Sequence, residues 1–311
     1  MTERRRLSEL IKNRAVETGF DLYGAAKARV LEEAIPRLES WCAEGMNDKM
    51  HYLGRDIQGR FDPFRLFPAA RSVIVTGFNY YTDDGQREDD VPLLSRYAYG
   101  RTYQTVIKEK LDSLLEYIKS LVPGADGKAF SDTGPIAEKR WAVEAGLGWQ
   151  GKHSIVISRE IGSFFFIGIL LLNIELEYDK PFSDDHCGSC RKCIDSCPTA
   201  AINDNFTIDA RKCISNLTIE NRDPVPARFV SLLGGRIYAC DKCQEVCPWN
   251  SSAKPHKHPE LAISGELASL TRDGWKSLDE KKFKNLFSDT PVGRVKFERF
   301  RKNLDSILNN G

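Results

Sequence analysis

Apolar residues recur every three or four positions in several stretches of the first 180 residues, which is the pattern of amphipathic helices. The clearest stretch spans residues 103–121, and the pair Pro123-Gly124 marks its end. In the first stretch we expect a buried stripe made by Leu7, Leu10, Ile11 and Val16. The predicted helices cover residues 7–18, 30–44 and 103–121, and a further helix follows Pro135 and ends near Gly146.

Other stretches are rich in β-branched and aromatic residues and predict strands. The longest apolar run, FFFIGILLL from Phe164 to Leu172, has nine residues, whereas a membrane-spanning helix needs roughly 20. We therefore interpret it as a buried strand that contains Gly168. Because strands and helices are interspersed, the chain up to about Asp179 predicts an α/β or α+β domain. The predicted strands cover residues 72–81, 128–131, 154–157 and 164–172.

The character of the chain changes after residue 180. Cysteine, proline and glycine become frequent, the apolar runs shorten, and a polar loop (SSAKPHKHPE) is followed by short amphipathic helices. We therefore predict an α+β protein in three parts. These are a mixed α/β domain (1–179), a compact cysteine-rich domain (180–252) and a C-terminal helical segment (253–311).

The charge and composition of the chain limit the classes of partner that it can bind. The net charge of +1 excludes a global attraction to polyanions, so a nucleic-acid site would be a local patch. Residues 272–302 hold ten Lys and Arg against five Asp and Glu, with five aromatic residues interleaved, and such a face could neutralise phosphates. A solvated helix face over an apolar core is the alternative. The interleaved aromatic residues are Trp275, Phe283, Phe287, Phe297 and Phe300, and Arg222 and the 254–258 loop are further candidates.

The first ten residues, MTERRRLSEL, lack the apolar core of a signal peptide, so we expect a cytoplasmic protein without a membrane segment. In a reducing compartment, nine cysteines favour metal ligation over disulfides, and an odd number fits disulfides poorly.

Eight of the nine cysteines form two related motifs. The run Cys187, Cys190, Cys193 and Cys197, followed by Pro198, is C-x2-C-x2-C-x3-C-P, in which the fourth cysteine binds the other cluster of a two-cluster ferredoxin. The second run holds Cys240, Cys243 and Cys247, and Cys213 supplies its missing thiolate. We therefore assign one [4Fe–4S] cluster to Cys187, Cys190, Cys193 and Cys247, and the other to Cys240, Cys243, Cys213 and Cys197.

Two structural zinc sites would also use eight thiolates, but zinc favours separated C-x2-C pairs. The ninth cysteine, Cys42, lies on a predicted helix and is interpreted as a small buried apolar residue. Two adjacent clusters indicate one-electron transfer and leave its destination open.

The segment GLGWQGKH, residues 146–153, contains two misleading motifs. It matches G-x-G-x-x-G, but a helix precedes it and a strand follows, the reverse of a dinucleotide site. It also nearly matches the sequence motif of a phosphate-binding loop, G-x-x-x-x-G-K-[ST]. However, His153 occupies the position at which Ser or Thr would bind magnesium. What remains is a glycine-rich turn, which either lets a ligand approach the backbone or joins a helix to a strand.

Asp132, in SDTGP, stands where a strand ends and a helix begins. One interpretation is the N-cap of the helix after Pro135, or an Asx-turn. The other is an acid at the mouth of a pocket, with its pKa raised by burial so that it carries a proton near neutral pH.

With these motifs the chain resembles epoxyqueuosine reductases, cobalamin-dependent iron–sulfur enzymes of tRNA queuosine synthesis. The resemblance runs nearly end to end and is most specific in the first cysteine run, in CDKCQEVCPWN (240–250) and in SDTGPIAEKRWAVEAGLGWQGKHS (131–154). It also includes MNDKMHYL (46–53), SRYAYGRTY (95–103) and CISNLTIE (213–220).

The resemblance implies that an external one-electron donor of the flavodoxin or ferredoxin type feeds two clusters, which reduce cobalamin. Reduced cobalt then engages the epoxide, water is lost and an alkene forms, with two electrons and two protons consumed. Asp132 matches the family's proton donor, and base-off cobalamin is expected between the N-terminal domain and one cluster. The expected cofactor contacts are Arg60, Tyr97, Asp132, His153, Ser215, Asp241 and Lys242; for His153, hydrogen bonding is favoured over cobalt ligation.

The expected substrate is the wobble base of the tRNA anticodon, flipped out of its stack to reach the buried cobalt. The chain departs from the family's usual pattern at Thr102, Gln104 and Asn216. It ends at Gly311 and is expected to lack the helical-repeat extension of some members, and to be a monomer. Two alternatives stay open: a cobalamin-dependent reductive dehalogenase, and a ferredoxin-like electron-transfer module.

Overall fold

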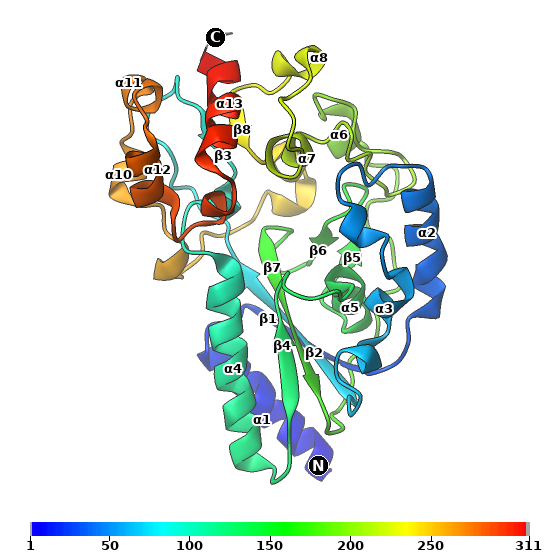
Figure 1. Ribbon diagram of the computed structural model, residues 1–311. Helices are drawn as coiled ribbons and strands as arrows, with labels where there is room; N and C mark the ends of the chain where they lie inside the picture. The colour runs from blue at the N-terminus through cyan, green and yellow to red at the C-terminus, as the bar shows by residue number, and fades with distance from the viewer. Residues whose placement is uncertain (1, 309–311) are drawn as a thin grey trace.

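The computed structural model describes residues 2–308 and confirms a mixed α and β architecture (Figure 1). Its centre is a four-stranded antiparallel sheet in the order β1-β2-β7-β4. Two short pairs lie apart from it, a parallel pair β3–β8 and an antiparallel pair β5–β6. The strands are β1 (Leu22–Lys27), β2 (Ser72–Asn79), β3 (Leu93–Leu94), β4 (Gly127–Phe130), β5 (Trp149–Gln150), β6 (Val156–Ile157), β7 (Phe165–Leu172) and β8 (Arg236–Tyr238).

The helices are long in the N-terminal part and mostly short after residue 180. Those of the N-terminal part are α1 (Glu3–Glu17), α2 (Ile35–Ala43), α3 (Ile57–Phe61), α4 (Tyr103–Leu121) and α5 (Glu138–Glu144). The rest are α6 (Lys192–Asp195), α7 (Ile214–Ile219), α8 (Ala227–Val230), α9 (Lys242–Glu245), α10 (Gly265–Ala268), α11 (Arg272–Lys276), α12 (Glu280–Phe287) and α13 (Phe297–Leu308). Seven 3-10 turns are η1 (Glu32–Ala34), η2 (His51–Leu53), η3 (Pro63–Arg65), η4 (Arg96–Ala98), η5 (Pro248–Asn250), η6 (Pro259–Leu261) and η7 (Pro291–Arg294).

Strand β2 is buried along its whole length because the sheet is covered on both faces. Successive side chains of a strand point to opposite faces. Ile74 therefore joins a core with α1 and α4, whereas Val73 and Val75 join a second core with α5. The predicted strand at 164–172 is confirmed as β7, where a Cβ on Gly168 would come within 2.6 Å of the Thr76 hydroxyl oxygen.

The predicted face of the first helix is partly wrong. Ile11 is fully buried, but Leu10 is 38% and Val16 58% exposed. The buried face is made by Ser8, Ile11 and Ala15, which lie three and four residues apart. The helix docks through small residues, so hydrophobicity alone did not identify its inner face.

The C-terminal helices enclose a third core. It holds the fully buried rings of Trp275, Phe287 and Phe300, together with Leu94 from β3 and Tyr238 from β8. Residues on both sides of the predicted boundary at 179 therefore share one core. The division into three parts stays a prediction from the sequence.

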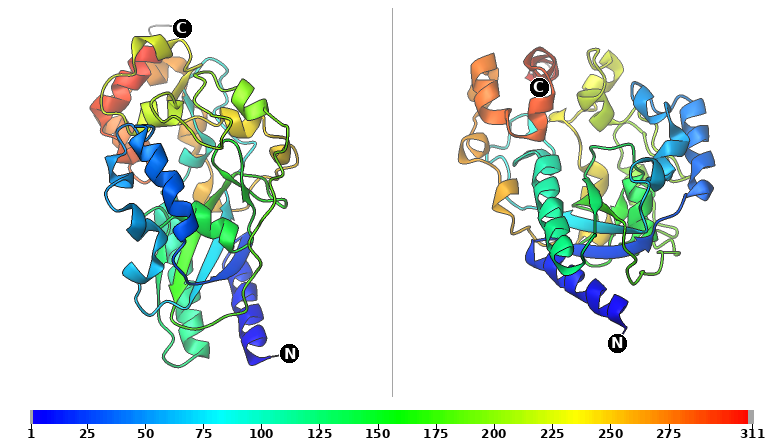
Figure 2. Two further views of the ribbon diagram at one scale, coloured as in Figure 1. Left: turned by 90° about the vertical axis from the view of Figure 1, so that its right-hand side faces the viewer. Right: turned by 60° about the horizontal axis from the view of Figure 1, so that its bottom comes forward.

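The outer elements frame the region between them. In Figures 1 and 2, α2 and α3 lie on one flank of the molecule and α10–α13 on the other, with α7 and α8 between. The N- and C-terminal ends lie at opposite ends of the molecule in Figure 1. Within residues 2–308, no helix combines the length and the apolar character that crossing a bilayer demands.

Candidate functional site

The eight motif cysteines come from four short helical segments and the loops before them. Cys193 lies in α6 and Cys243 in α9, two four-residue helices that contact each other. Cys213 is the residue before α7, and Cys247 the residue before η5. None of the nine cysteines is in a disulfide.

One group of thiols contains Cys187, Cys190, Cys193 and Cys247. Burial, together with the neighbouring Cys187, Cys247 and Cys190 thiols, raises the pKa of Cys193 to about 11. Burial likewise raises the pKa of Cys247, with Cys187 and Cys190 adding to the effect. These mutual effects on pKa require the four sulfurs to lie close together.

A second group contains Cys197, Cys213, Cys240 and Cys243. Burial raises the pKa of Cys213, and the Cys197 thiol adds to it. Burial raises the pKa of Cys240 to about 11, with Cys213 contributing. Cys243 is raised well above its usual pKa by burial and by Cys213 and Cys240.

The surroundings of these thiols fit iron–sulfur clusters. Backbone N–H groups point at the sulfurs, as in the Ala201 amide, 3.3 Å from Cys197 Sγ. Among residues 2–308, no set of three or more His, Cys, Asp or Glu side chains converges on the position of a single metal ion. The assignment of ligands stays a prediction.

Cys42 belongs to neither group. It is half-buried in α2 and lies 3.7 Å from the position of a Cβ on Gly54. Its burial raises its pKa, and the charge of Arg60 lowers it. No other cysteine influences it.

The glycine-rich segment at 146–153 contains β5 and most of the turn of the β5–β6 hairpin, whose tip is residues 151–155. Gly148 permits this close pairing, because a Cβ there would come within 1.9 Å of the Ile157 carbonyl oxygen. At the tip, the Lys152 side chain is 10% exposed and its Nζ donates to the Gly188 carbonyl oxygen at 2.9 Å. Gly188 lies between two cysteines of the first group, so the hairpin contacts a cluster loop.

Asp132 stands at the mouth of a pocket and is exposed there, so the expected burial is wrong. Its backbone is left-handed, with φ of 53°. Oδ2 accepts hydrogen bonds from the Tyr103 hydroxyl at 2.6 Å and from Gln104 Nε2 at 3.2 Å. The N-cap interpretation is also wrong, because α5 begins at Glu138 and Ala137 occupies the cap position.

The pocket has a volume of about 210 Å³. Burial raises the pKa of Glu138 to about 8, and the charge of Asp132 contributes, although the Asp132 amide lowers it by donating to the Glu138 carboxylate. Desolvation by the surrounding protein lowers the pKa of Lys139, although water still reaches its side chain through the open mouth. The lining residues are Tyr103, Asp132, Glu138, Lys139, Ile155, Val156, Phe165, Phe166 and Ile167.

His153 lies at the tip of the β5–β6 hairpin and is not one of the residues that line the pocket. It is 1% exposed, and burial lowers its pKa to about 4, so its ring is neutral at neutral pH. Nδ1 accepts the Ile155 N–H at 3.2 Å, which places the ring proton on Nε2. That nitrogen is buried without a partner. A buried donor is almost always satisfied, so an acceptor on a bound group is expected there.

Two other residues predicted to contact the cofactor, Arg60 and Tyr97, make contacts with residues of the protein itself. Arg60 donates to the carbonyl oxygens of Tyr52 at 2.7 Å and Leu53 at 3.2 Å. The Tyr97 ring packs edge-on against Tyr103, with 6.2 Å between centroids. Their roles at a corrin stay predictions.

Three predicted contacts lie next to cluster cysteines. Ser215 directs its amide and hydroxyl at the Cys213 sulfur, and the Lys242 amide points at Cys240. Asp241 is buried, and its carboxylate accepts from the Ser95 hydroxyl and from the Arg96 amide at 2.9 Å. Its side chain therefore joins the start of η4 to the segment that holds Cys240 and Cys243.

The three departures from the family pattern each make a specific contact. Gln104 holds Asp132, the Thr102 amide donates to the Asp289 carbonyl oxygen at 2.7 Å, and Asn216 Nδ2 donates to Asp48 Oδ2 at 2.8 Å. The aromatic residues at 275–300, by contrast, pack inside the third core, as the solvated-helix interpretation predicted.

Sequence reasoning missed Tyr103, Glu138 and Lys139 as pocket residues, and Lys152 as a contact of the cluster loop. Glu138 and Lys139 lie six and seven residues after Asp132, and this spacing was the only available signal. Tyr103 opens the clearest helix, where it was taken only as a boundary residue.

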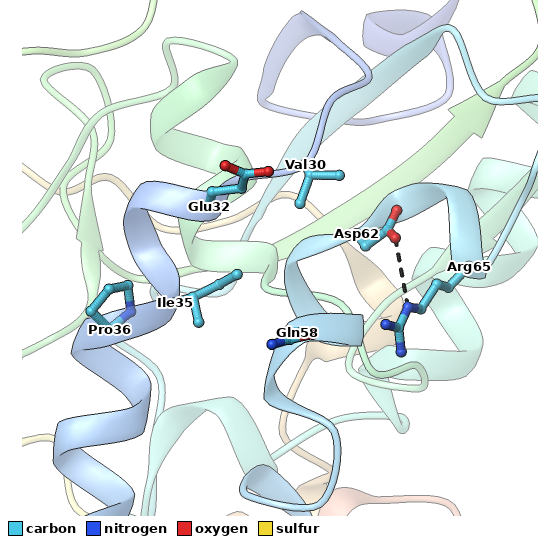
Figure 3. A pocket seen from close by; sticks show the side chains of 7 residues that line it. All are labelled: Val30, Glu32, Ile35, Pro36, Gln58, Asp62 and Arg65. Carbon is cyan, nitrogen blue, oxygen red and sulfur yellow. Dashed lines mark ion pairs between the residues drawn. The ribbon is translucent and has the colours of Figure 1, made fainter.

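A second hollow, of about 370 Å³, lies between η1–α2 and α3–η3 (Figure 3). It contains the ion pair between Arg65 Nε and Asp62 Oδ2, 3.6 Å apart. It holds no cysteine and no aromatic side chain, and its lining residues are Val30, Glu32, Ile35, Pro36, Gln58, Asp62 and Arg65.

Two family models match the chain. Residues 60–133 match the model described as "Epoxyqueuosine reductase QueG, DUF1730", and residues 186–250 match "4Fe-4S double cluster binding domain". The epoxyqueuosine reductase of Cellulophaga algicola is 41% identical over 307 residues, which cover 99% of this chain and all of the relative. That of Leadbetterella byssophila is 42% identical over 298 residues, covering 96% and 97%.

Solved structures agree with these relatives. Epoxyqueuosine reductase from Streptococcus thermophilus has a TM-score of 0.88 at 28% identity, covering 97% of this chain and 80% of the other. An epoxyqueuosine reductase with a tRNA-Tyr epoxyqueuosine-modified stem loop has a TM-score of 0.86 at 29% identity, covering 97% and 81%. The reductive dehalogenase NpRdhA has a TM-score of 0.54 at 17% identity over 81% of this chain and 33% of the other, which shows a shared fold alone.

Proposed function

This chain belongs to the epoxyqueuosine reductase family, and from that membership we propose that it reduces epoxyqueuosine to queuosine at the anticodon wobble position of tRNA. The observation that carries the proposal is full-length identity of about 40% to named epoxyqueuosine reductases, over a segment that includes both the Asp132 pocket and all eight motif cysteines. The dehalogenase alternative rests on a likeness of fold, and the electron-transfer alternative does not explain the pocket.

The reaction sets the requirements for the site. Converting an epoxide to an alkene breaks two C–O bonds, releases the oxygen as water and consumes two electrons and two protons. Two [4Fe–4S] clusters supply single electrons, and bound cobalamin supplies the low-potential metal centre at which both electrons are used. The remaining requirement, two protons delivered in order to one oxygen atom, falls to side chains of the pocket.

Asp132 and Glu138 are the two carboxyl groups of the pocket. Tyr103 and Gln104 hold the Asp132 carboxylate at the mouth, where it can reach a base that enters from solvent. With a pKa of about 8, Glu138 keeps its proton at neutral pH and can supply it to the site, where the Asp132 carboxylate can pass protons from solvent to the oxygen. Lys139, held by its bond to the Ser154 carbonyl oxygen at 3.0 Å, places a donor on the same wall.

Cobalamin is proposed on three grounds: the family, the unpartnered Nε2 of His153, and the position of the pocket beside the β5–β6 hairpin that touches a cluster loop. His153 would donate to an amide oxygen on the corrin rim. Arg60, Tyr97, Ser215, Asp241 and Lys242 are proposed as further contacts, the last three through segments that also hold cluster cysteines. An external flavodoxin- or ferredoxin-type donor, a monomeric state and a cytoplasmic location complete the proposal.

The proposal is tested in two steps. Protein reconstituted without oxygen should contain about eight irons and eight sulfides, and one cobalt after cobalamin is added. Mass spectrometry of tRNA nucleosides should show epoxyqueuosine accumulating in a gene-deletion strain and queuosine restored by the wild-type gene. Two zinc atoms with negligible iron, or unchanged queuosine in the deletion strain, would refute it.

A further inference from the structure

Tyr52 is the one exposed Phe, Tyr or Trp side chain among residues 2–308, and its neighbour His51 is exposed as well. The residue is 46% exposed, whereas the other exposed large apolar side chains are leucines and one valine. The aromatic residues of the basic C-terminal stretch are buried in a core or packed against it. Tyr52 is therefore the Phe, Tyr or Trp ring that a base could reach and stack on from the outside of the protein.

The ring is held on a rigid support. The Arg60 side chain donates to the Tyr52 and Leu53 carbonyl oxygens, and its guanidinium carbon lies 5.7 Å from the Tyr52 ring centroid. With Arg60 over one side, the exposed surface of the ring lies away from it. The preceding segment is anchored as well, because the Asp48 carboxylate accepts from Asn216 Nδ2 at 2.8 Å.

This support connects directly to the catalytic pocket. The Arg60 carbonyl oxygen accepts the Ala137 N–H at 2.9 Å, and the next residue, Glu138, lines the pocket and binds the Asp132 amide. Burial raises the pKa of the Tyr52 hydroxyl, and the charges of Glu220 and Asp132 raise it further. The geometric connection between the ring and the pocket runs through Arg60 and Ala137 to Glu138.

Cationic groups surround the same spot. Arg294 pairs with Glu220, and its charge together with that of Arg60 acts on the Tyr52 hydroxyl. Lys49, three residues before Tyr52, is half exposed and 3.6 Å from an Asp223 carboxylate oxygen. Arg60 contacts the ring directly, whereas Arg294 and Lys49 are each paired with an acid. An aromatic ring with a cation beside it is a surface that proteins use for single-stranded nucleic acid.

We propose that Tyr52 is the stacking platform for a nucleotide next to the reacting base of the RNA. The proposal rests on the proposed function. A base that leaves its stack to enter the pocket exposes the faces of its neighbours, and a ring at the mouth replaces the lost partner. The positive charge of Arg60, beside the ring, then lies near the phosphates of the stacked nucleotide.

The test uses the cluster- and cobalamin-loaded enzyme and two tRNA anticodon stem–loops, each with 2-aminopurine on one side of the wobble position. Stacking on a ring quenches 2-aminopurine fluorescence. Wild-type protein and Tyr52→Phe, which keeps the ring, should quench one of the two probes. Tyr52→Ala and Tyr52→Leu should leave that probe bright and weaken RNA binding about tenfold, since one stacked base contributes roughly that much.

Leu121→Ala is the matched control. Leu121 is 38% exposed at the far end of α4, ~27 Å along the helix from Tyr103 at ~1.5 Å per residue, so its removal should change neither quenching nor affinity. For turnover, Tyr52→Ala should raise KM for RNA with a smaller change in kcat.

Other outcomes overturn the proposal. Equal quenching in wild type, Tyr52→Ala and Tyr52→Leu would show that the ring does not stack on a base. Loss of cobalamin, or a raised KM for the electron donor with RNA binding intact, would assign Tyr52 to the corrin or to the donor instead.

If wild-type protein fails to reduce epoxyqueuosine but still shows ring-dependent quenching, the proposed reaction fails and the RNA platform stands.

Discussion

The Tyr103 hydroxyl donates to Asp132 Oδ2 at 2.6 Å, and this contact connects the first residue of the long helix α4 to the loop after β4. The Tyr103 ring also lies flat on Phe166, with 4.0 Å between centroids and an interplanar angle of 4°. Ring and hydroxyl thus hold a carboxylate whose left-handed backbone, at φ of 53°, places it at the pocket mouth. This relationship makes Asp132 a positioned acid and leads to the first two predictions.

Replacing Asp132 with Asn should abolish most turnover while both clusters and cobalamin still bind. A positioned general acid contributes about 10²- to 10⁴-fold, and the amide cannot supply a proton. Single-turnover measurements on tRNA, together with iron and cobalt content, check this. Turnover like that of wild type would remove Asp132 from the mechanism.

Tyr103→Phe should lower kcat about tenfold or more, because a hydrogen bond to a charged group contributes roughly 1.5–3 kcal/mol and its loss frees the Asp132 side chain. The stack on Phe166 remains, so the fold should be retained. Tyr178→Phe, which loses a hydroxyl bonded to the Arg71 carbonyl oxygen on another part of the sheet, is the control. Equal kcat values for the two variants would contradict the positioning role.

Glu138 should make the enzyme sensitive to alkaline pH. Its pKa of about 8 lies above the ordinary 4.5, so the folded protein holds a proton that the unfolded chain has lost. Stability from this group is therefore complete below pH 4.5 and declines as pH rises to about 8. Glu138→Gln should remove this decline and also the loss of kcat near pH 8, at a lower maximal rate.

Thermal unfolding and pH–rate profiles of Glu138→Gln, with Glu116→Gln on the exposed side of α4 as the control, provide the measurement. Parallel stability curves for wild type and Glu138→Gln between pH 5 and pH 9 would argue against a protonated Glu138.

Cys213→Ser should lose one cluster, about half of the iron, because Cys213 supplies the thiolate that the second motif lacks. Cys42→Ser should keep the full iron content, since no other thiol influences the pKa of Cys42. Iron and sulfide analysis of the two variants, prepared together, decides the ligand assignment. Iron loss in Cys42→Ser would show that the assignment is wrong.

Lys152→Met should make the first cluster labile, because the near-buried ammonium holds the Gly188 carbonyl oxygen between two of its cysteines. We expect faster iron release under air, with Lys27→Met in β1 as the matched charge-loss control. The electron paramagnetic resonance signal of the first cluster should also shift. Identical release rates would restrict Lys152 to a packing role.

Local pattern was sufficient for some elements. The helix at 103–121 begins and ends at the predicted residues because its apolar spacing, its length and Pro123-Gly124 all agree. The strand at β7 was found because nine apolar residues in a row fit only a strand buried on both faces. Strand β1 was missed, since its LYGAAK sequence is short and weakly apolar and becomes a strand by pairing with β2.

Local sequence pattern predicted one part of the site and not the other. Cysteine spacing alone predicted two clusters and their ligands, because a short loop that wraps a cluster restricts where thiolates can stand. The pocket could not be predicted in this way. Tyr103, Asp132, Glu138 and Phe166 lie on different elements, and only the packing of α4, the loop after β4, α5 and β7 brings them together around the pocket. The sequence determined which groups are present, and the tertiary structure decided which of them are buried, paired or left facing a ligand, because burial and distance set their chemistry.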